Sequence, residues 1–273
     1  MQPPRLIASD VDGTLLDPTD RVTARTVAAI ERLVAAGSGF VLVTGRPPRW
    51  IQPIREQVGV VRLAVCANGA LIYDAVADEV LWARTMDPDT LAVLAEAAMA
   101  TLPDCGLAVE RSGPAGDGSM PSFIADAEYL HAWDTGLQVH LERFDRAALL
   151  AEPAVKLLVR CPRLRSEEML AQLAPVIGTT ADLTFSTSKG LIEISPNGVT
   201  KATGLAEVAR RLDVAAADVI AFGDMPNDIE MLRWAGRGVA MGNAHPALLA
   251  VADEVAPSNG DDGIAVVLER FLR

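Results

Sequence analysis

The 273-residue sequence has few cysteines and no long hydrophobic run. Its three cysteines, Cys66, Cys105 and Cys161, lie far apart and form no CxxC pair, which excludes a disulfide framework and a cysteine-based zinc site. No apolar stretch reaches the roughly 20 residues that a membrane-spanning helix needs, and the opening segment MQPPRLIASD lacks the apolar run of a signal peptide. We therefore expect a cytoplasmic protein that does not enter a membrane.

Positive charge is also scarce. The chain has 24 lysines and arginines against 36 aspartates and glutamates, which gives a formal net charge of −12. A protein of this charge has no broad basic surface to attract nucleic acid or an anionic membrane, so we expect neither as a partner. Lysine is rare even within the basic set, which contains only Lys156, Lys189 and Lys201.

Short apolar segments recur along the chain, and each one ends at a polar or glycine-containing turn. They occupy residues 6–8, 40–43, 63–65, 219–222 and 239–241. Strands that are apolar throughout are typical of a parallel sheet covered on both faces. Between them, residues 23–36 and 203–212 have the apolar spacing of amphipathic helices. This alternation predicts an α/β fold with a doubly wound parallel sheet.

The middle of the chain has a different pattern. Helices are predicted at 90–101, 146–151 and 166–177, and strands at 107–110, 122–125, 155–159 and on both sides of 187–190. Paired strands beside helices indicate an inserted α+β domain with an antiparallel sheet. We place this insert at residues 85–189 and the core at 1–84 and 190–273. The 15 acidic and eight basic residues of the insert offer no strong grip for a second phosphate.

Two groups of side chains in the insert are noteworthy. One group is Arg160, Arg163 and Arg165, which we expect in a solvated turn around Pro162. The other is His131, Trp133 and His140, which either pack within the domain or line a substrate pocket. The sequence leaves this second choice open.

Polar side chains follow three of the predicted core strands. They are Asp10 and Asp12 after the first strand, Thr44, Gly45 and Arg46 after the second, and Asp224, Asn227 and Asp228 after a late one. The carboxyl ends of parallel strands share one edge of the sheet, which is where ligands bind. Four carboxylates that meet there repel one another unless a cation lies between them. Oxygen ligands of this kind suit Mg²⁺.

Each piece also has a purely structural interpretation. The Asp12–Gly13 pair is common in turns, and Thr44 could cap a helix. Asn227 and Asp228 could stabilise the start of a helix. An EF-hand is excluded, because its glycine would stand at the sixth position of the loop and not at the fourth. The occurrence of all three groups at strand ends favours a site.

Four segments resemble the motifs of the haloacid-dehalogenase-like (HAD) phosphohydrolases: DVDGTLL, VLVTGR, the lysine of GVTKATGL, and GDMPNDIEML. The segment ANGALI and the tail GNAHPALLAVADEVAPSNGDDGIA resemble the Cof-type subfamily, which has a large α/β cap between the second and third motifs. The resemblance implies a Rossmann-like core and a Mg²⁺-dependent phosphatase with an aspartyl-phosphate intermediate. One departure is Ala202, where the family often has glycine.

On this resemblance, Asp10 is the nucleophile and Asp12 the general acid and base. Residues two apart on a strand share a face, so both carboxylates are expected to point at one substrate. The resemblance also makes the backbone carbonyl of Asp12 a metal ligand. Lys201 is expected to neutralise charge on the phosphate and the nucleophile. The rarity of lysine supports a specific need for an ammonium at this position, against the alternative of chance.

The remaining candidates are assigned in the same way. Asp224 is the expected direct Mg²⁺ ligand, and Asp228 either holds metal-bound water or orients other groups. Thr44 and the backbone at Gly45 are expected to donate hydrogen bonds to phosphoryl oxygens. Further candidates for substrate contacts are Arg46, Asn68 and Asn227, the last of which could instead belong to the metal shell.

The expected function is hydrolysis of a small phosphate ester, such as a sugar phosphate or a cofactor precursor. Two alternatives use the same fold: a phosphomutase, and a non-catalytic phosphate-binding module. The acidic insert disfavours the first, and the presence of both Asp12 and Asp224 disfavours the second. The natural substrate and the choice between monomer and homodimer stay open.

Overall fold

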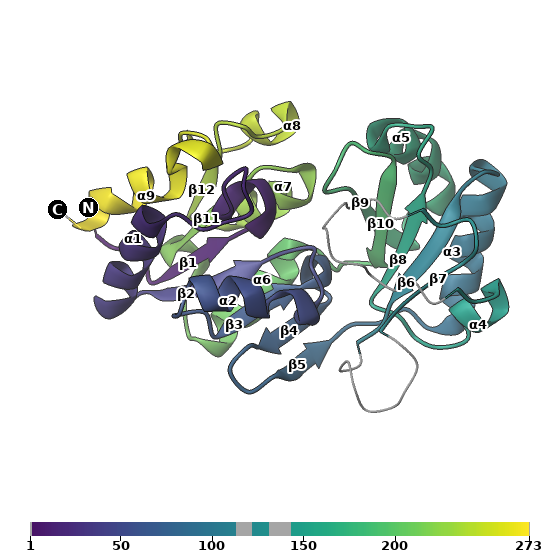
Figure 1. Ribbon diagram of the computed structural model, residues 1–273, viewed down its shortest axis with the longest axis horizontal. Coiled ribbons are helices and arrows are strands. Elements are labelled where there is room, and N and C mark those ends of the chain that lie inside the picture. Colours follow the sequence, from purple (N-terminus) through teal and green to yellow (C-terminus); the bar gives the residue numbers. More distant parts are fainter. Residues whose placement is uncertain (1, 113–121, 131–142, 273) are drawn as a thin grey trace. The chain divides into compact units, whose positions relative to one another are not determined.

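The structure is a computed structural model that describes residues 2–112, 122–130 and 143–272 (Figure 1). The chain folds into two compact units. Unit 1 comprises Met1–Trp82 and Thr200–Arg273, and unit 2 comprises Ala83–Val199. The predicted cap residues His131, Trp133 and His140 lie outside the described residues.

Unit 1 contains an eight-stranded sheet with the order β13-β12-β11-β1-β2-β3-β4-β5. The first six strands in this order are parallel to their neighbours: β13 (Glu254–Val255), β12 (Arg237–Ala240), β11 (Val219–Gly223), β1 (Leu6–Ser9), β2 (Gly39–Val43) and β3 (Leu63–Cys66). β4 (Leu71–Asp74) is antiparallel to β3, and β5 (Glu79–Ala83) lies at the edge. All five predicted core strands are present.

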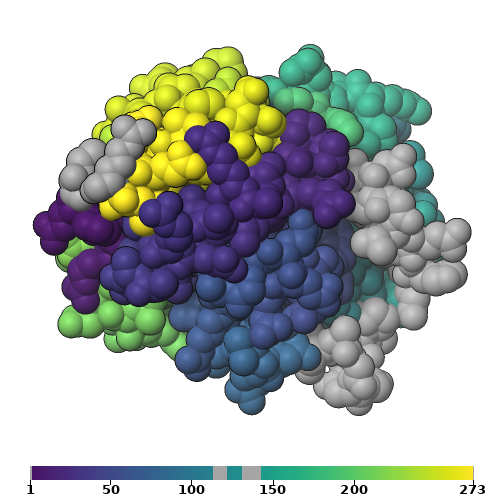
Figure 2. All heavy atoms as spheres, turned by 60° about the vertical axis from the view of Figure 1, so that its left-hand side comes forward, coloured from purple at the N-terminus to yellow at the C-terminus, as the bar shows by residue number. Residues whose placement is uncertain are grey.

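Helices connect these strands in the manner of a doubly wound fold, which confirms the predicted fold class (Figure 1). They are α1 (Ala24–Ala35), α2 (Gln52–Gln57), α6 (Lys201–Arg211), α7 (Ile229–Trp234), α8 (Pro246–Leu249) and α9 (Gly263–Leu268). The buried side chains of α6 and α7 pack with those of β1, β2 and β11 in one apolar cluster. α1 contacts α9, and the purple and yellow segments that contain them lie side by side in Figure 2.

The strand order of unit 1 reverses at β1. From β1 the chain proceeds outward to β2 and β3, whereas the later strands β11, β12 and β13 extend on the other side of β1. The carboxyl edge at such a reversal is the usual place for a ligand in an open α/β sheet. The residues that follow β1, β2 and β11 are therefore the first place to look for a site.

Unit 2 contains a five-stranded antiparallel sheet with the order β7-β6-β8-β10-β9. Its strands are β6 (Gly106–Glu110), β7 (Phe123–Ala125), β8 (Lys156–Arg160), β9 (Ala181–Thr184) and β10 (Leu191–Pro196). Its helices are α3 (Pro88–Thr101), α4 (Arg146–Leu150) and α5 (Ser166–Ile177), of which α3 and α5 contact each other. The expected α+β insert is thus present.

Two expectations for the insert differ from the structure. Unit 2 ends after Val199, ten residues later than the predicted boundary, because β10 pairs with β8 and β9. The solvated turn is wrong for Arg160, which is buried in β8 and donates hydrogen bonds to the carbonyls of Leu130 and Gly190. Its guanidinium satisfies carbonyl groups outside the strands of the sheet and is not on the surface.

The described helices are all too short or too polar to cross a bilayer, and none is a candidate membrane span.

Candidate active site

The site begins where β1 ends. β1 stops at Ser9, and the backbone amide of Asp10 still donates to the carbonyl of Phe222 on β11 (3.0 Å). Residues Val11–Leu15 then form a tight turn in which Gly13 has a φ of +77°. The turn, and not the alternation of a strand, therefore places Asp10 and Asp12, and their surroundings differ.

Three carboxylates meet next to this turn. Asp10, Asp224 and Asp228 are all buried, and each offers an oxygen within 4.8 Å of the oxygens of the other two. They come from the ends of β1 and β11, which are neighbours in the sheet. The predicted convergence of these three carboxylates is therefore present, and Asp12 is not part of this cluster.

Lys201 lies in the same cluster with 1% of its side chain exposed. Its Nζ donates to Oδ1 of Asp10 and to Oδ1 of Asp228, each at 2.6 Å. One ammonium thus faces three buried carboxylates. This contact brings a residue 191 positions away in sequence onto the predicted nucleophile.

The start of α6 explains how Lys201 reaches this position. Thr200 caps the helix through a reciprocal pair of hydrogen bonds with Thr203, so the helix begins at Lys201 and not at the predicted residue 203. The chain at Gly69 passes against this helix start, because a Cβ on Gly69 would lie 2.0 Å from the Thr200 carbonyl oxygen. Gly69 also has a φ of +104°.

Asp228 orients its neighbours. Its Oδ1 accepts from Lys201, and its Oδ2 accepts from the backbone amides of Asp224 and Met225, both at 3.0 Å. Gly223 leaves room for this contact, since a Cβ there would lie 2.5 Å from the Cβ of Asp228. Of the two predicted roles, this geometry favours the orienting one.

Asp224 has a partner that the sequence analysis did not identify. The hydroxyl of Thr14 donates to Asp224 Oδ1 (3.1 Å), which ties the turn after β1 to the loop after β11. Gly13 lies against the same carboxylate, since a Cβ on it would be 2.3 Å from Asp224 Oδ2. Thr14 and Gly69 lie within the motifs DVDGTLL and ANGALI, and this position was the one feature of the sequence that could have identified them as site residues.

Burial raises the pKa values of two of these carboxyl groups. The pKa of Asp10 rises to about 7, because desolvation and the charges of Asp228 and Asp12 outweigh the nearby Lys201 ammonium. The pKa of Asp224 rises to about 9 through desolvation and the charges of Asp10 and Asp228. Burial lowers the pKa of Lys201, but its two aspartate partners outweigh burial and leave it raised. Beside a single ammonium and without a cation, the carboxyl groups of this buried cluster therefore resist full ionisation.

Asp12 forms a second, separate contact. Arg46 holds its carboxylate by two parallel hydrogen bonds, Nε to Oδ2 at 2.8 Å and Nη2 to Oδ1 at 2.5 Å. Asp12 is 58% exposed at its side chain, whereas Arg46 is 21% exposed. Burial alone would lower the pKa of Arg46, but the Asp12 carboxylate outweighs it and raises that pKa. The candidate substrate contact Arg46 is thus also a partner of the candidate acid and base.

The other candidates lie after β2, β3 and β11. The Thr44 hydroxyl accepts a hydrogen bond from the backbone amide of Arg46 (3.1 Å), and Gly45 lies between these two residues in the chain. Asn68 has a left-handed backbone with a φ of 56°, and its Oδ1 accepts from Asn227 Nδ2 (3.1 Å). The Oδ1 of Asn227 is buried without a hydrogen-bond partner among the described residues. These two asparagines therefore form a polar pair with an acceptor left over.

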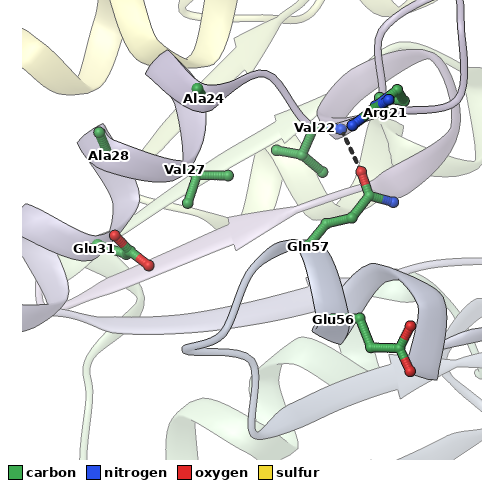
Figure 3. Close-up of a pocket in the computed structure, with 8 residues that line it drawn as sticks. All are labelled: Arg21, Val22, Ala24, Val27, Ala28, Glu31, Glu56 and Gln57. Carbon is green, nitrogen blue, oxygen red and sulfur yellow. Dashed lines mark hydrogen bonds between the residues drawn. The ribbon is translucent and has the colours of Figure 1, made fainter.

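A pocket elsewhere on unit 1 contains no predicted site residue (Figure 3). It is lined by Arg21, Val22, Ala24, Val27, Ala28, Glu31, Glu56 and Gln57. Its single drawn hydrogen bond runs from the Val22 amide to Gln57 Oε1 (2.9 Å). Nothing in this lining resembles the charge cluster at the sheet edge.

Comparison with known proteins connects this geometry to a family. The model of the haloacid dehalogenase-like hydrolases matches residues 7–268. An HMP-PP phosphatase of Serratia proteamaculans is 32% identical over 277 residues, which cover 98% of this chain and 96% of that protein. The 5-amino-6-(5-phospho-D-ribitylamino)uracil phosphatase YitU of Bacillus subtilis is 28% identical, with 98% of each chain covered.

Solved structures agree on the fold. A HAD subclass IIB sugar phosphatase superposes with a TM-score of 0.82 at 22% identity and covers 98% of both chains. A second HAD phosphatase, from Bacteroides thetaiotaomicron, gives a TM-score of 0.81 at 23% identity and covers 98% of this chain and 95% of its own. The chain therefore belongs to the haloacid dehalogenase-like hydrolases, and it is an enzyme of their phosphatase type.

Proposed function

We propose that the protein is a Mg²⁺-dependent phosphomonoester hydrolase that carries the phosphoryl group transiently on Asp10. The observation that carries this proposal is the buried Asp10 carboxylate, which accepts a hydrogen bond from Lys201 beside Asp224 and Asp228. A carboxylate held between an ammonium and a potential cation site is suited to attack an anionic phosphoryl group.

The residues present fit a Mg²⁺ ion. Three carboxylates offer oxygens within 4.8 Å of one another, and the raised pKa values of Asp10 and Asp224 indicate that a cation would favour their ionised forms. Asp10 and Asp224 would hold the ion, together with the backbone carbonyl of Asp12, while Asp228 orients this group. When bound, Mg²⁺ supplies charge neutralisation at the phosphoryl oxygens.

The chain's own residues then divide the reaction. A carboxylate oxygen of Asp10 attacks phosphorus as the bond from phosphorus to the ester oxygen breaks. The Asp12 carboxyl gives its proton to that departing oxygen. Asp12 then takes a proton from the water that attacks the phosphoryl group on Asp10, which regenerates both side chains. Lys201 stabilises the negative charge on Asp10 and the phosphoryl group throughout.

Substrate contacts are assigned to the polar groups around the turn. Thr44 and the backbone at Gly45 would donate to phosphoryl oxygens, and Arg46 would support them. Asn68 and Asn227 would bind the leaving group, since Asn227 Oδ1 is a buried acceptor that lacks a partner within the described residues. We place the enzyme in the cytoplasm and its substrate among small phosphorylated metabolites.

The substrate class follows from charge and from the relatives. An acidic chain with a local cation site favours a small phosphate ester over a polyanion. The relatives' names point to sugar phosphates and cofactor precursors as the compounds to screen. A phosphomutase needs a second phosphate site, and the acidic insert gives no support for one.

The test is hydrolysis of 4-nitrophenyl phosphate by the full chain with Mg²⁺ or with excess chelator. We expect turnover that needs the metal and that falls by at least about 10³-fold in Asp10→Asn. Equal turnover in Asp10→Asn, or in chelator, would contradict the proposal. Ranking phosphorylated metabolites by kcat/KM then identifies the substrate.

A further inference from the structure

Asp12 differs from the other site carboxylates in how it is held. Among the described residues, its exposed carboxylate is held by a single side chain, the guanidinium of Arg46. Asp10, Asp224 and Asp228 are instead buried, with Lys201 donating to Asp10 and Asp228 and Thr14 donating to Asp224. An exposed aspartate with one partner takes its orientation from that partner.

Arg46 is itself fixed by its backbone. Its amide donates to the Thr44 hydroxyl (3.1 Å), and its carbonyl accepts from the Ala67 amide (3.0 Å). The turn that carries Asp12 is anchored separately, because Asn243 Nδ2 donates to the Gly13 carbonyl (2.8 Å). The contact between the Arg46 guanidinium and the Asp12 carboxylate therefore joins two backbone segments that are each fixed by their own hydrogen bonds.

We propose that Arg46 is the positioning residue of the general acid, and that through Asp12 it sets how well the enzyme hydrolyses esters with poor leaving groups. This inference rests on the proposed function and goes beyond the substrate contact assigned to Arg46. The two parallel N–H···O bonds fix the plane of the Asp12 carboxyl group. Each carboxyl oxygen keeps a second lone-pair position, where the transferable proton can sit.

The step that depends on this geometry is proton transfer to the leaving oxygen. As the bond from Asp10 to phosphorus forms and the phosphorus–oxygen ester bond breaks, its electron pair stays on the leaving oxygen and the Asp12 proton moves there. An alkoxide leaving group needs this proton, whereas 4-nitrophenolate is stable without it. A misplaced Asp12 therefore slows alkyl phosphates more than aryl phosphates.

The experiment compares kcat/KM for an alkyl phosphate, glycerol 2-phosphate, with that for 4-nitrophenyl phosphate. This constant includes the steps through departure of the leaving group and excludes later hydrolysis of phospho-Asp10. For Arg46→Met we expect the loss on the alkyl ester to exceed the loss on the aryl ester by roughly 10- to 100-fold. An equal loss on both esters would mean direct phosphate binding and would overturn the proposal.

A double-mutant cycle tests whether Arg46 acts through Asp12. In an Asp12→Asn background, Arg46→Met should cost almost nothing further on the alkyl ester, because the positioned group is already lost. Additive losses would contradict the proposal. Arg46→Lys keeps the charge but cannot form two parallel bonds, so it should behave like the methionine variant. Full activity in Arg46→Lys would show that charge alone suffices, against a positioning role.

Arg25 supplies a matched control. It forms the same two-bond contact with Glu269 in unit 1, with both distances at 2.8 Å. Arg25→Met should leave the ratio of the two kcat/KM values unchanged. If the wild type and Asp10→Asn turned over equally, the proposed function itself would be wrong. That outcome is distinct from an unchanged ratio of the two kcat/KM values in Arg46→Met, which would contradict only this inference.

Discussion

Two of the three lysines are buried on carboxylates, one in each unit. In unit 1, Lys201 donates to both Asp10 and Asp228 beside a third carboxylate, Asp224. In unit 2, Lys156 on β8 donates to Glu193 on β10, and the second oxygen of Glu193 accepts from the Ser186 hydroxyl (2.6 Å). Both lysines are almost fully excluded from solvent.

The difference between these clusters lies in their charge and their partners. The Lys156–Glu193 pair joins two neighbouring strands of an antiparallel sheet, and Glu193 also accepts from Ser186. The Lys201 cluster collects carboxylates from two strand ends and has raised pKa values at Asp10 and Asp224. Burial of a lysine therefore does not mark a catalytic site. The feature specific to the Lys201 cluster is that three carboxylates meet within 4.8 Å at the carboxyl edge of a parallel sheet, an arrangement that favours a cation.

The sharpest test of this contrast is removal of Lys201. In Lys201→Met, kcat should fall by about 10²- to 10³-fold, since charge on Asp10 and the phosphoryl group loses its ammonium partner. Steady-state kinetics on 4-nitrophenyl phosphate, corrected for the folded fraction, checks this. An unchanged kcat would remove Lys201 from the mechanism.

The matched variant in unit 2 should affect stability and not chemistry. Lys156→Met leaves Glu193 buried without its cation, and we expect a loss of about 3 kcal/mol of unfolding free energy. The melting temperature should fall by roughly 6–12 °C for a chain of this size. Thermal unfolding and kcat at a temperature where the variant is folded measure both effects. A large drop in the kcat of fully folded Lys156→Met would contradict the difference between the two lysines.

The apparent affinity for Mg²⁺ should rise with pH. The pKa values of Asp10 and Asp224, about 7 and about 9, mean that both groups hold protons in the metal-free enzyme at low pH. The ion must displace these protons, so its affinity should fall at least about tenfold between pH 8 and pH 6. Titration of activity with Mg²⁺ at several pH values measures this. A Mg²⁺ affinity that is constant over this pH range would contradict the raised pKa values of Asp10 and Asp224.

The smallest expected effect concerns stability without metal. The raised pKa of Asp224 means that the folded protein holds this proton more tightly than the unfolded chain. The folded state therefore loses stability as the pH rises from the ordinary pKa of 3.8 toward about 9, because the unfolded chain ionises first. Asp224→Asn cannot ionise, and its melting temperature at pH 8 in chelator should exceed that of the wild type by a few °C. The gain should disappear near pH 4. A lower melting temperature at pH 8 would oppose this prediction.

The fold and the convergence of Asp10, Asp224 and Asp228 were predictable because they depend on local patterns. The apolar runs at 6–8, 40–43 and 219–222 became parallel strands, and the polar residues after them meet at one sheet edge. The position of Lys201 required more than pattern. The local cap at Thr200 fixes where α6 begins, and the close approach of Gly69 to Thr200 is a contact between distant segments.

The separate surroundings of Asp10 and Asp12 were less accessible to prediction. Alternation along a strand was the predicted reason for both to face one substrate, but β1 ends before them and the turn of Val11–Leu15 begins between them. The partners Thr14 and Arg46 could not be assigned from spacing, because they depend on how the turn packs. The end of the insert was missed for a similar reason, since β10 pairs across the sheet with β8.

The most direct measurement for the proposed mechanism is mass spectrometry of enzyme quenched in acid during turnover with Mg²⁺. We predict one added phosphoryl group on the peptide that contains Asp10 in the wild type, and none on that peptide in Asp10→Asn. With 4-nitrophenyl phosphate, whose leaving group needs no proton, Asp12→Asn should accumulate more of this species, because the base that activates water is missing. Turnover with no phosphoryl group on Asp10, or with one on another residue, would contradict the account.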